Sequence, residues 1–440
     1  MAEIRPFFGW RYNPELRGRW ADLLTPPYDV ISPEMRRKLL ARHERSFARI
    51  DLPRLESDPP DDAAYARAGD LWRVWKADGT FERDRRPAFY VYEQEFDLPG
   101  RGRRTRRGFL CEVRLRDYAD GVILGHEQTF ALHRTDRIKL MRATRATTSA
   151  IFSIYDDPER RAREALDAAI EGRAPESAEI DGVVHRAWVV DDEAAISRVG
   201  QAIAPLEIYI ADGHHRYETA LAYRDERRGE AGRAGGDEPH EWTLMHLVDS
   251  RDEGLAILPT HRILKKAAGV RTAEEALPEL AAHFRIEPLD LPAGAEAAAA
   301  VATSRLSEAG ARGPAIAVIL PGGPSHLLRL REGADLSALV PGDLPDEVKR
   351  LDVTLLHRGA LPAWLGGERE LGPEAIDYVK DAGEVVARLR EGDDAAAGFL
   401  LNPTRMDQVV QVSRLGLRMP QKSTYFYPKI ITGLVARDLE

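Results

Sequence analysis

The sequence predicts an α/β protein of the α+β type, in which helices and strands alternate around mixed sheets. Cys111, Val113 and Leu115 alternate with charged residues, which is the period-two pattern of a half-buried strand. The apolar run 206–211 is typical of a short strand, and it passes through a glycine into a helix. Helices and strands also alternate in the last third, where we expect strands at 316–320, 327–330 and 399–401.

Composition limits the partners of this chain. Of its 440 residues 43% are hydrophobic, enough to build cores in two or three domains. Its 63 basic and 72 acidic side chains give a net charge of −9, so it has no bulk attraction for nucleic acid or an anionic membrane. DNA is therefore not an expected partner, and any bound anion must be held by a local site. The one cysteine, Cys111, excludes an internal disulfide and a cysteine-rich zinc module.

The N-terminus and the apolar runs predict a soluble, cytoplasmic protein without a membrane segment. Residues 1–6 place an acidic residue and a proline where a signal peptide has its basic and apolar regions. No apolar run approaches the roughly 20 residues that span a bilayer.

Prolines and capping residues mark the elements of residues 1–84. The pair Pro26-Pro27 disfavours helix before it and predicts extended backbone or a turn. Ser32 followed by Pro33 is typical of a helix start. A second helix is expected over 62–77, where apolar residues recur at helical spacing.

Beyond residue 88 the pattern changes to strands. We expect strands at 89–92 and 109–115, joined by the arginine-rich run 101–107, which is typical of a solvated hairpin loop rather than an RNA-binding patch. Further helices are expected at 137–145, 158–170, 293–312 and 404–416. The last of these opens with a capping box formed by Thr404 and Asp407.

The first segment that could carry chemistry is Asp212-Gly213-His214-His215-Arg216. A strand that enters a helix through a glycine exposes unpaired amides and the positive end of the helix dipole, which suits an anion. Two imidazoles and a guanidinium add donors for phosphate oxygens. The helix is expected to run to about Arg228 and to stop at Gly229. A polar turn in which Asp212 merely caps the helix is an equally weighted alternative.

The second segment is Gly125-His126-Glu127, with Arg134, Asp136 and Arg137 downstream. Phe130 stands where a zincin helix has its second histidine, so that metalloprotease motif is excluded. Glu127 is a candidate general base or cation ligand. Taken alone, a His-Glu pair is more often a surface ion-pair partner, and this is the favoured alternative.

The third segment is Lys422-Ser423-Thr424, followed by Lys429. Gly416 stands at the first glycine of a P-loop pattern, but Gln421 replaces the second glycine and no helix is expected to follow. The P-loop interpretation therefore fails. What remains is a basic segment able to bind a carboxylate or phosphate, or a strand whose lysines face solvent.

Taken together, the three segments resemble the archaeal free serine kinases, whose fold belongs to the ParB/sulfiredoxin-like superfamily. The shared features, in chain order, are a His-Glu pair, the Asp-Gly-His-His-Arg run, and Pro403-Thr404 followed by Pro420-Gln421-Lys422-Ser423-Thr424. The whole chain also resembles a bacterial family of unknown function, often labelled ParB-like, through Pro26-Pro27-Tyr28-Asp29 and the run from Met419 to Phe426. Residues 1–84 have no counterpart in the kinases.

The resemblance implies a ParB/sulfiredoxin-like mixed-sheet core with additions at both ends. It divides the chain into an N-terminal extension, a phosphate-binding domain and a C-terminal α/β domain that closes the site, at 1–84, 85–258 and 259–440. Sulfiredoxin chemistry is excluded, because His214 stands in the place of the sulfiredoxin cysteine. Chromosome partitioning is disfavoured, because ParB proteins carry Gly-Glu-Arg-Arg and append DNA-binding helices.

The implied activity is phosphorylation of free L-serine to O-phosphoserine, with ATP, ADP or pyrophosphate as donor and Mg²⁺ as cofactor. Glu127 would be the general base, with His126 and Asp212 also catalytic, and Asp212 would orient the donor or hold Mg²⁺. The resemblance assigns the donor phosphates to Gly213, His214, His215, Arg216 and Lys422, and the substrate to Ser423, Thr424, Arg137 and Lys429. The alternatives are a ParB-like nucleotide-binding regulator without turnover and a phosphoester hydrolase. A homodimer is left open.

Overall fold

The computed structural model describes residues 1–55, 58–59, 61–98, 100–127, 131–232, 235–267, 269–367, 375–392 and 394–440, with the backbone alone at 131–134. The chain forms two compact units. The first comprises Met1–Gly125, Thr129–Ala256 and Phe426–Glu440, and the second comprises His126–Gln128 and Ile257–Tyr425. The α+β architecture expected from the sequence is confirmed, since each unit combines helices with a sheet.

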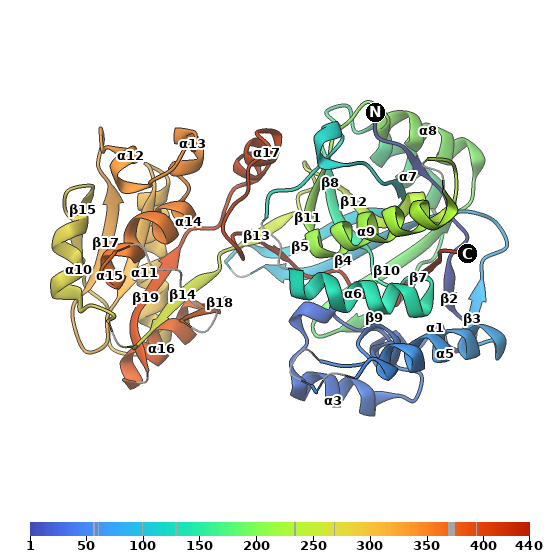
Figure 1. Ribbon diagram of the computed structural model, residues 1–440, viewed down its shortest axis with the longest axis horizontal. Coiled ribbons are helices and arrows are strands. Elements are labelled where there is room, and N and C mark those ends of the chain that lie inside the picture. The colour runs from blue at the N-terminus through green and yellow to red at the C-terminus, as the bar shows by residue number, and fades with distance from the viewer. Residues whose placement is uncertain are drawn as a thin grey trace. The chain divides into compact units, whose positions relative to one another are not determined.

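The first unit is built on a mixed sheet with the strand order β6-β11-β8-β12-β5-β4-β10-β9, and β1 pairs with β5 (Figure 1). The pairs β11–β6 and β12–β8 are parallel, and the other neighbours are antiparallel. The strands are β1 Ile4–Arg5, β4 Phe89–Leu98, β5 Gly102–Arg114, β6 Ile123–Leu124, β8 Ile151–Tyr155, β9 Glu176–Ile180, β10 Val183–Val190, β11 Ile208–Asp212 and β12 Trp242–Asp249.

Helices α7 Arg161–Ile170, α8 Glu193–Ile203 and α9 His214–Ala231 pack on this sheet. Helices α5 Ala63–Ala77 and α6 Ala131–Thr144 also belong to this unit. Helix α6 lies between α5 and α9 (Figure 1). Ile210 of β11 and Tyr217 of α9 are both fully buried in the core of the unit. The turn between β11 and α9 is therefore anchored in the core on both sides.

The first unit also contains shorter elements, many of them near the two ends of the chain. They are β2 Trp10–Tyr12, α1 Pro14–Arg17, α2 Trp20–Leu23, η1 Tyr28–Val30, α3 Pro33–Arg42, α4 Ala48–Asp51, β3 Phe81–Arg83, η2 Tyr118–Asp120, β7 Ala146–Thr147, η3 Pro239–Glu241 and β21 Arg437–Asp438. Strand β21 pairs with β7, and β2 pairs with β3. The structure thus groups residues 1–84 and 426–440 with the middle of the chain, unlike the three-part division drawn from the sequence.

The second unit is built on an antiparallel sheet with the strand order β15-β17-β16-β19-β14-β18 (Figure 1). The strands are β14 His261–Lys265, β15 Phe284–Leu289, β16 Ala315–Ile319, β17 Ser325–Leu330, β18 Ile376–Val379 and β19 Ala395–Leu401. Strands β13 Ala256–Leu258 and β20 Tyr425–Tyr427 contain the residues at which the chain passes from one unit to the other.

Both faces of this second sheet are covered. Helices α11 Ala295–Gly310 and α16 Ala382–Glu391 pack on one face, with Ala317 of β16 in that core. Ile316 and Val318 of the same strand lie in the opposite core. That core also takes residues from α10 Ala273–Leu280, α12 Leu336–Leu339, α13 Asp346–Lys349, α14 Asp352–Thr354, the π-helical turn η4 Leu355–Ala360, α15 Leu361–Leu365 and α17 Met406–Arg414. Successive side chains of β16 point to opposite faces of the sheet. Because both faces are covered, almost every residue of the strand is apolar.

The arginine-rich run 101–107 was predicted as a solvated loop, and this is wrong: strand β5 begins at residue 102. The strand forms because acidic residues of β4 face the arginines across the antiparallel pair. Arg107 forms an ion pair with Glu93, and Arg103 forms one with Glu95. Cross-strand pairs of opposite charge stabilise a sheet, so a charged run need not be a loop.

Helix starts were predicted better than helix ends. Helix α3 begins at Pro33, and the Ser32 hydroxyl accepts the Met35 amide at 3.2 Å, as expected. Helix α9 does not stop at Gly229 but continues to Ala231 and ends at Gly232, which has the left-handed φ of 65°. A glycine ends a helix where it takes the left-handed conformation, and only the second of these glycines does so.

The predicted capping box at Thr404 and Asp407 is also wrong. Helix α17 begins at Met406, and the Arg405 amide donates to the Gln408 side chain at 2.9 Å. The Thr404 hydroxyl instead donates to the Ser423 carbonyl at 2.8 Å. No helix among the described residues combines the length and apolar character that crossing a bilayer requires.

Candidate functional site

The turn between β11 and α9 begins with a position that requires glycine. Gly213 is the N-cap of α9 and has a φ of 93°. A Cβ at this position would also lie 2.7 Å from the Arg216 Nε, which is too close for any side chain. The backbone can therefore approach the Arg216 guanidinium closely at the start of the helix.

A cluster of three charges stands at this turn, and we call Asp212, Arg216 and Lys429 the anion cluster. Arg216 donates to Asp212 Oδ2 at 2.7 Å, and the Lys429 ammonium donates to Asp212 Oδ1. Burial alone would raise the pKa of Asp212, but the charges of Lys429 and Arg216 outweigh it and hold that pKa well below its ordinary value. With Asp212 ionised, the cluster carries a net charge of +1.

Lys429 reaches Asp212 because the chain around it is fixed by two residues of the central sheet. The Arg106 guanidinium of β5 donates to the carbonyls of Tyr427 at 3.2 Å and Pro428 at 2.5 Å. The Gln94 side chain of β4 donates to the Lys429 carbonyl at 2.9 Å. Burial lowers the pKa of Arg106 to about 10, so it remains charged at neutral pH. Sequence analysis missed both positioning residues, since Arg106 lay in the run assigned to a loop.

The two histidines of this turn differ in exposure. His214 is 3% exposed, and its ring lies against Gly125, where an added Cβ would come within 3.0 Å of it. His215 is half-buried, and its carbonyl accepts the Thr219 hydroxyl at 2.7 Å. The predicted run therefore supplies a buried imidazole, a half-buried imidazole and a buried guanidinium to the start of one helix.

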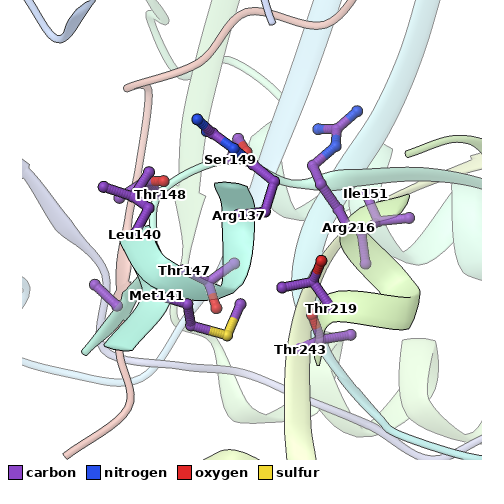
Figure 2. Close-up of a pocket in the computed structure, with 11 residues that line it drawn as sticks. Arg137, Leu140, Met141, Thr147, Thr148, Ser149, Ile151, Arg216, Thr219 and Thr243 are labelled. Atoms are coloured by element: carbon purple, nitrogen blue, oxygen red, sulfur yellow. The ribbon is translucent and has the colours of Figure 1, made fainter. Parts of the chain in front are cut away.

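A hollow beside this turn is lined by hydroxyl groups and two arginines (Figure 2). Arg137 of α6 and Arg216 of α9 line it, and their guanidinium groups point toward the same end of it (Figure 2). Its space of about 30 Å³ is the size of a water molecule. The other lining residues are Leu140, Met141, Ala146, Thr147, Thr148, Ser149, Ile151, Thr219 and Thr243.

Arg137, predicted to bind substrate, is held tightly by its neighbours. Its guanidinium donates to the Asp136 carboxylate at 2.5 Å and to the Asp51 carbonyl at 2.8 Å. It also lies over the Tyr28 ring, 4.2 Å from the ring centre. The structure thus gives Arg137 a connecting position, between α6 and the N-terminal residues.

The second unit holds His126 and Glu127 of the second predicted segment together with residues 422–424 of the third. His126 Nε2 and the Thr424 Oγ1 are 2.9 Å apart, and the Met419 amide donates to the His126 carbonyl at 2.7 Å. The Lys422 amide donates to Glu127 Oε1 at 3.0 Å. Two segments almost 300 residues apart in the chain are therefore paired, as an interaction between the predicted segments would require. We call His126, Glu127, Lys422, Thr424 and Arg262 the carboxylate cluster.

Lys422 has an unusual backbone in this cluster. Its φ of 53° lies in the left-handed region, which costs a side-chain-bearing residue about 1 kcal/mol. This conformation accompanies the Lys422 amide bond to the Glu127 carboxylate. The Lys422 side chain itself is exposed, and its ammonium lies 5.4 Å from the centre of the Tyr378 ring.

Arg262 is a buried member of this cluster, and the sequence analysis did not predict it as a site residue. It is 1% exposed, and it donates to the Lys422 carbonyl at 3.0 Å and to His357 Nε2 at 3.2 Å. Burial lowers the pKa of Arg262 to about 10, while Tyr378 and Glu127 act in the other direction. Burial and the nearby Arg262 charge lower the pKa of His357 to about 3, so His357 is neutral and accepts the hydrogen bond. Sequence analysis did not single it out, because one arginine within a short strand matches no motif.

The structure therefore distributes the predicted residues over two clusters. The run Asp212 to Arg216 lies with Lys429, whereas His126 and Glu127 lie with Lys422 and Thr424. Lys429 and Lys422 were predicted to act together, and they belong to different units.

Asp212 was also expected to bind Mg²⁺, and its present surroundings do not fit a metal ion. Both carboxylate oxygens accept hydrogen bonds from cations, Lys429 on one side and Arg216 on the other, where Mg²⁺ requires oxygen ligands. Among the described residues, the one group with metal-ligand spacing is Glu238, His240 and Glu241. Arg228 already forms an ion pair with Glu241 there. We therefore assign no step to a metal.

Comparison with known proteins places this chain in a family. The family model described as "Protein of unknown function (DUF1015)" matches residues 4–354, and the chain belongs to that family. No curated protein sequence matches it.

Several solved structures are similar to this chain at low identity. A glutamate-to-glutamine variant of a free serine kinase in complex with AMP has 11% identity and a TM-score of 0.34, over 70% of this chain and 84% of that one. A conserved hypothetical protein from Pyrococcus furiosus has 13% identity and a TM-score of 0.33, over 70% and 89% of the two chains. C-terminally truncated SbnI from Staphylococcus aureus has 10% identity and a TM-score of 0.30, over 74% and 81%. Because these identities and TM-scores are low, the function proposed below is argued from the residues of this chain.

Proposed function

We propose that this protein is a small-molecule kinase that transfers a phosphoryl group from ATP, ADP or pyrophosphate to the hydroxyl of free L-serine. The observation that carries the proposal is the anion cluster at the start of α9. The first amides of that helix, the positive end of its dipole and the net charge of +1 all favour an anion at one turn. A donor phosphate suits this site, because its oxygens accept several charge-assisted hydrogen bonds at once.

The carboxylate cluster supplies the base that the proposal needs. Phosphoryl transfer depends on positioning, charge neutralisation and a group that orients the attacking hydroxyl. The Lys422 amide fixes one oxygen of Glu127, and the His126 contacts fix the chain beside it. In the proposed step the serine oxygen attacks the terminal phosphorus, and the bond from that phosphorus to its bridging oxygen breaks. Glu127 takes the hydroxyl proton, and the leaving phosphate keeps the electron pair.

The remaining assignments belong to the same proposal. In the first unit, Gly213, His214, His215 and Arg216 would bind the donor phosphates. In the second unit, Lys422 keeps its predicted role at the donor, and Ser423 and Thr424 would contact the substrate. Membership of the ParB/sulfiredoxin-like superfamily, a cytoplasmic location and a homodimer stay predictions.

A direct assay tests the proposal. Purified protein is incubated with serine, threonine or glycerol against ATP, ADP and pyrophosphate, each with and without Mg²⁺, and products are identified by ³¹P NMR and mass spectrometry. We expect O-phosphoserine with at least one donor and no product from glycerol. Absence of phosphoserine with every donor would overturn the proposed activity.

Glu127→Gln is the variant that separates a kinase from its main alternative. Because the glutamine side chain can still accept the Lys422 amide but cannot take a proton, turnover should fall by about 10²- to 10⁴-fold while donor binding is kept. Glu164→Gln, on the exposed face of α7, makes the same charge change as a control and should leave both unchanged.

The alternative is a nucleotide-binding regulator without turnover, which the anion cluster alone would also suit. Such a protein should bind nucleotide equally well with and without the Glu127 carboxylate. Release of phosphate in the absence of any acceptor would instead indicate a hydrolase.

A further inference from the structure

Residues 1–84 have no part in the proposed chemistry, yet one motif among them lies beside the anion cluster. Pro27 is extended, with φ −63° and ψ 148°, and the turn Tyr28–Val30 follows it. Thr25 and Thr432 exchange two backbone hydrogen bonds, at 3.1 and 2.7 Å. Lys429 precedes Thr432 by three residues in that same C-terminal stretch. Backbone hydrogen bonds therefore connect the N-terminal residues that contain Tyr28 with the C-terminal residues that contain Lys429.

Side-chain contacts continue this connection toward the start of α9. The Arg137 guanidinium covers the Tyr28 ring, and Arg137 is 5% exposed and fixed by Asp136. Arg137 and Arg216 line one hollow, with their guanidinium groups directed to the same end (Figure 2). Arg216 in turn donates to Asp212. Arg137 thus connects Tyr28 to the anion cluster, because it contacts the Tyr28 ring and lines the same hollow as Arg216.

Two donors in this region have no protein acceptor. The half-buried Tyr28 hydroxyl makes no hydrogen bond to any residue within the described ranges, and neither does the Arg216 Nε, although Arg216 is only 7% exposed. Buried polar groups are nearly always paired, so the Arg216 Nε at a cationic turn has room for an acceptor that a ligand supplies, and the half-buried Tyr28 hydroxyl is a second donor in the same region. Burial raises the pKa of Tyr28, which Arg137 opposes only in part, and Arg216 and Asp212 lie within electrostatic reach of the ring. The phenol therefore keeps its proton at neutral pH and can donate it.

We propose that Tyr28 is a ligand-binding residue of the anion cluster, and that its hydroxyl donates to an anionic oxygen of the molecule held by Arg216 and Lys429. The identity of that molecule rests on the proposed function: the oxygen belongs to the donor phosphate or to the carboxylate of the acceptor amino acid. The N-terminal residues are on this view a part of the site and not an accessory to it.

The test is Tyr28→Phe, which removes the hydroxyl and keeps the ring beneath Arg137. Tyr223→Phe is the matched control: it removes a buried tyrosine hydroxyl about 13 Å along α9 from the start of that helix. Binding of pyrophosphate, ADP and serine to the full-length protein is measured separately by calorimetry. Thermal unfolding of each variant verifies that it is folded.

We expect Tyr28→Phe to weaken binding by about tenfold, the effect of one hydrogen bond to a charged group, and Tyr223→Phe to have no effect. A loss confined to pyrophosphate and ADP assigns Tyr28 to the donor, and a loss confined to serine assigns it to the acceptor. Unchanged binding of all three by Tyr28→Phe, or a wild-type protein that binds none of them, overturns the inference.

The outcome is distinguishable from that of the proposed function. A protein whose pyrophosphate binding depends on Tyr28 but which forms no phosphoserine retains this inference and loses the kinase. A protein that forms phosphoserine with equal KM values in wild type and Tyr28→Phe retains the kinase and loses this inference.

Discussion

The anion cluster and the carboxylate cluster hold their central carboxylates by opposite means. Asp212 is held by two cationic side chains, so its charge is more than compensated and the turn favours an anion. Glu127 accepts a backbone amide, which fixes one of its oxygens, and the buried Arg262 lies within electrostatic reach of it. A neutralised carboxylate suits binding and a positioned one suits proton transfer. The difference teaches that the surroundings of a carboxylate, and not its residue type, decide its use.

The largest effect on ligand binding should come from removing the charge that Lys429 contributes. Lys429→Met takes the net charge of the anion cluster from +1 to 0 and leaves Asp212 paired only with Arg216. Pyrophosphate binding, measured by calorimetry, should weaken by about 10- to 100-fold.

A double variant keeps this experiment interpretable. Lys429→Met with Asp212→Asn returns the net charge to +1 and should recover part of the lost affinity. If the double variant binds pyrophosphate as weakly as Lys429→Met does, the net charge does not control binding and the electrostatic explanation of the cluster is wrong. Urea unfolding of both variants separates a loss of binding from a loss of fold.

Acid should act on the carboxylate cluster through His357 at a higher pH than it acts on the anion cluster through Asp212. The folded-state pKa of His357 is lowered to about 3, so its contribution to stability is present above about pH 6.5 and is lost as pH falls toward 3. Asp212 also has a lowered pKa, but its contribution is present above its ordinary value near 4 and is lost only below it. Between pH 6.5 and 4, protonation of His357 therefore acts on the cluster that it supports through Arg262, before Asp212 itself is protonated.

His357→Gln isolates this response. Glutamine keeps an acceptor for the Arg262 guanidinium and does not titrate in this range. The Tm of the wild type should fall relative to that of His357→Gln as pH drops from 6.5 to 4, with the two closest at pH 7.5. Parallel Tm curves over this range would show that His357 does not couple the cluster to pH.

The smallest effect concerns the backbone that positions Glu127. Lys422→Gly relieves the left-handed conformation at φ 53° and keeps the amide that Glu127 accepts, so Tm should rise by about 2 °C. Lys422→Ala removes the same side chain but keeps the conformational cost, so it should show no such rise. A glycine variant less stable than the alanine variant would contradict a strained Lys422.

The local parts of this structure were predictable because neighbours in the chain decide them. A strand followed by glycine and a helix at 206–216 follows from short-range patterns, as does the Ser32 cap of α3. The assignment of Asp212 to Arg216 as an anion-binding turn needed only that local geometry. The predicted roles of Gly229 and Thr404 were wrong, since several residues near each could end or cap the helix.

The pairing of the segments was only partly predictable. Family resemblance placed His126, Glu127 and Lys422 in one protein with one function, and the structure brings them together. Lys429, close to Lys422 in sequence, was predicted to bind the substrate, and its ammonium contacts Asp212. Arg106 decides this placement from within β5, and no local pattern connects it to residue 429.

By itself the sequence determined the elements and the charge-bearing turn of this protein, because hydrophobic period, glycine and capping residues act over a few positions. Only the tertiary structure decided which charges meet: Lys429 with Asp212, the Lys422 amide with Glu127, and Arg137 with Tyr28. Such contacts depend on strand order and on where the chain crosses from one unit to the other, and these follow from the packing of the whole core rather than from adjacent residues.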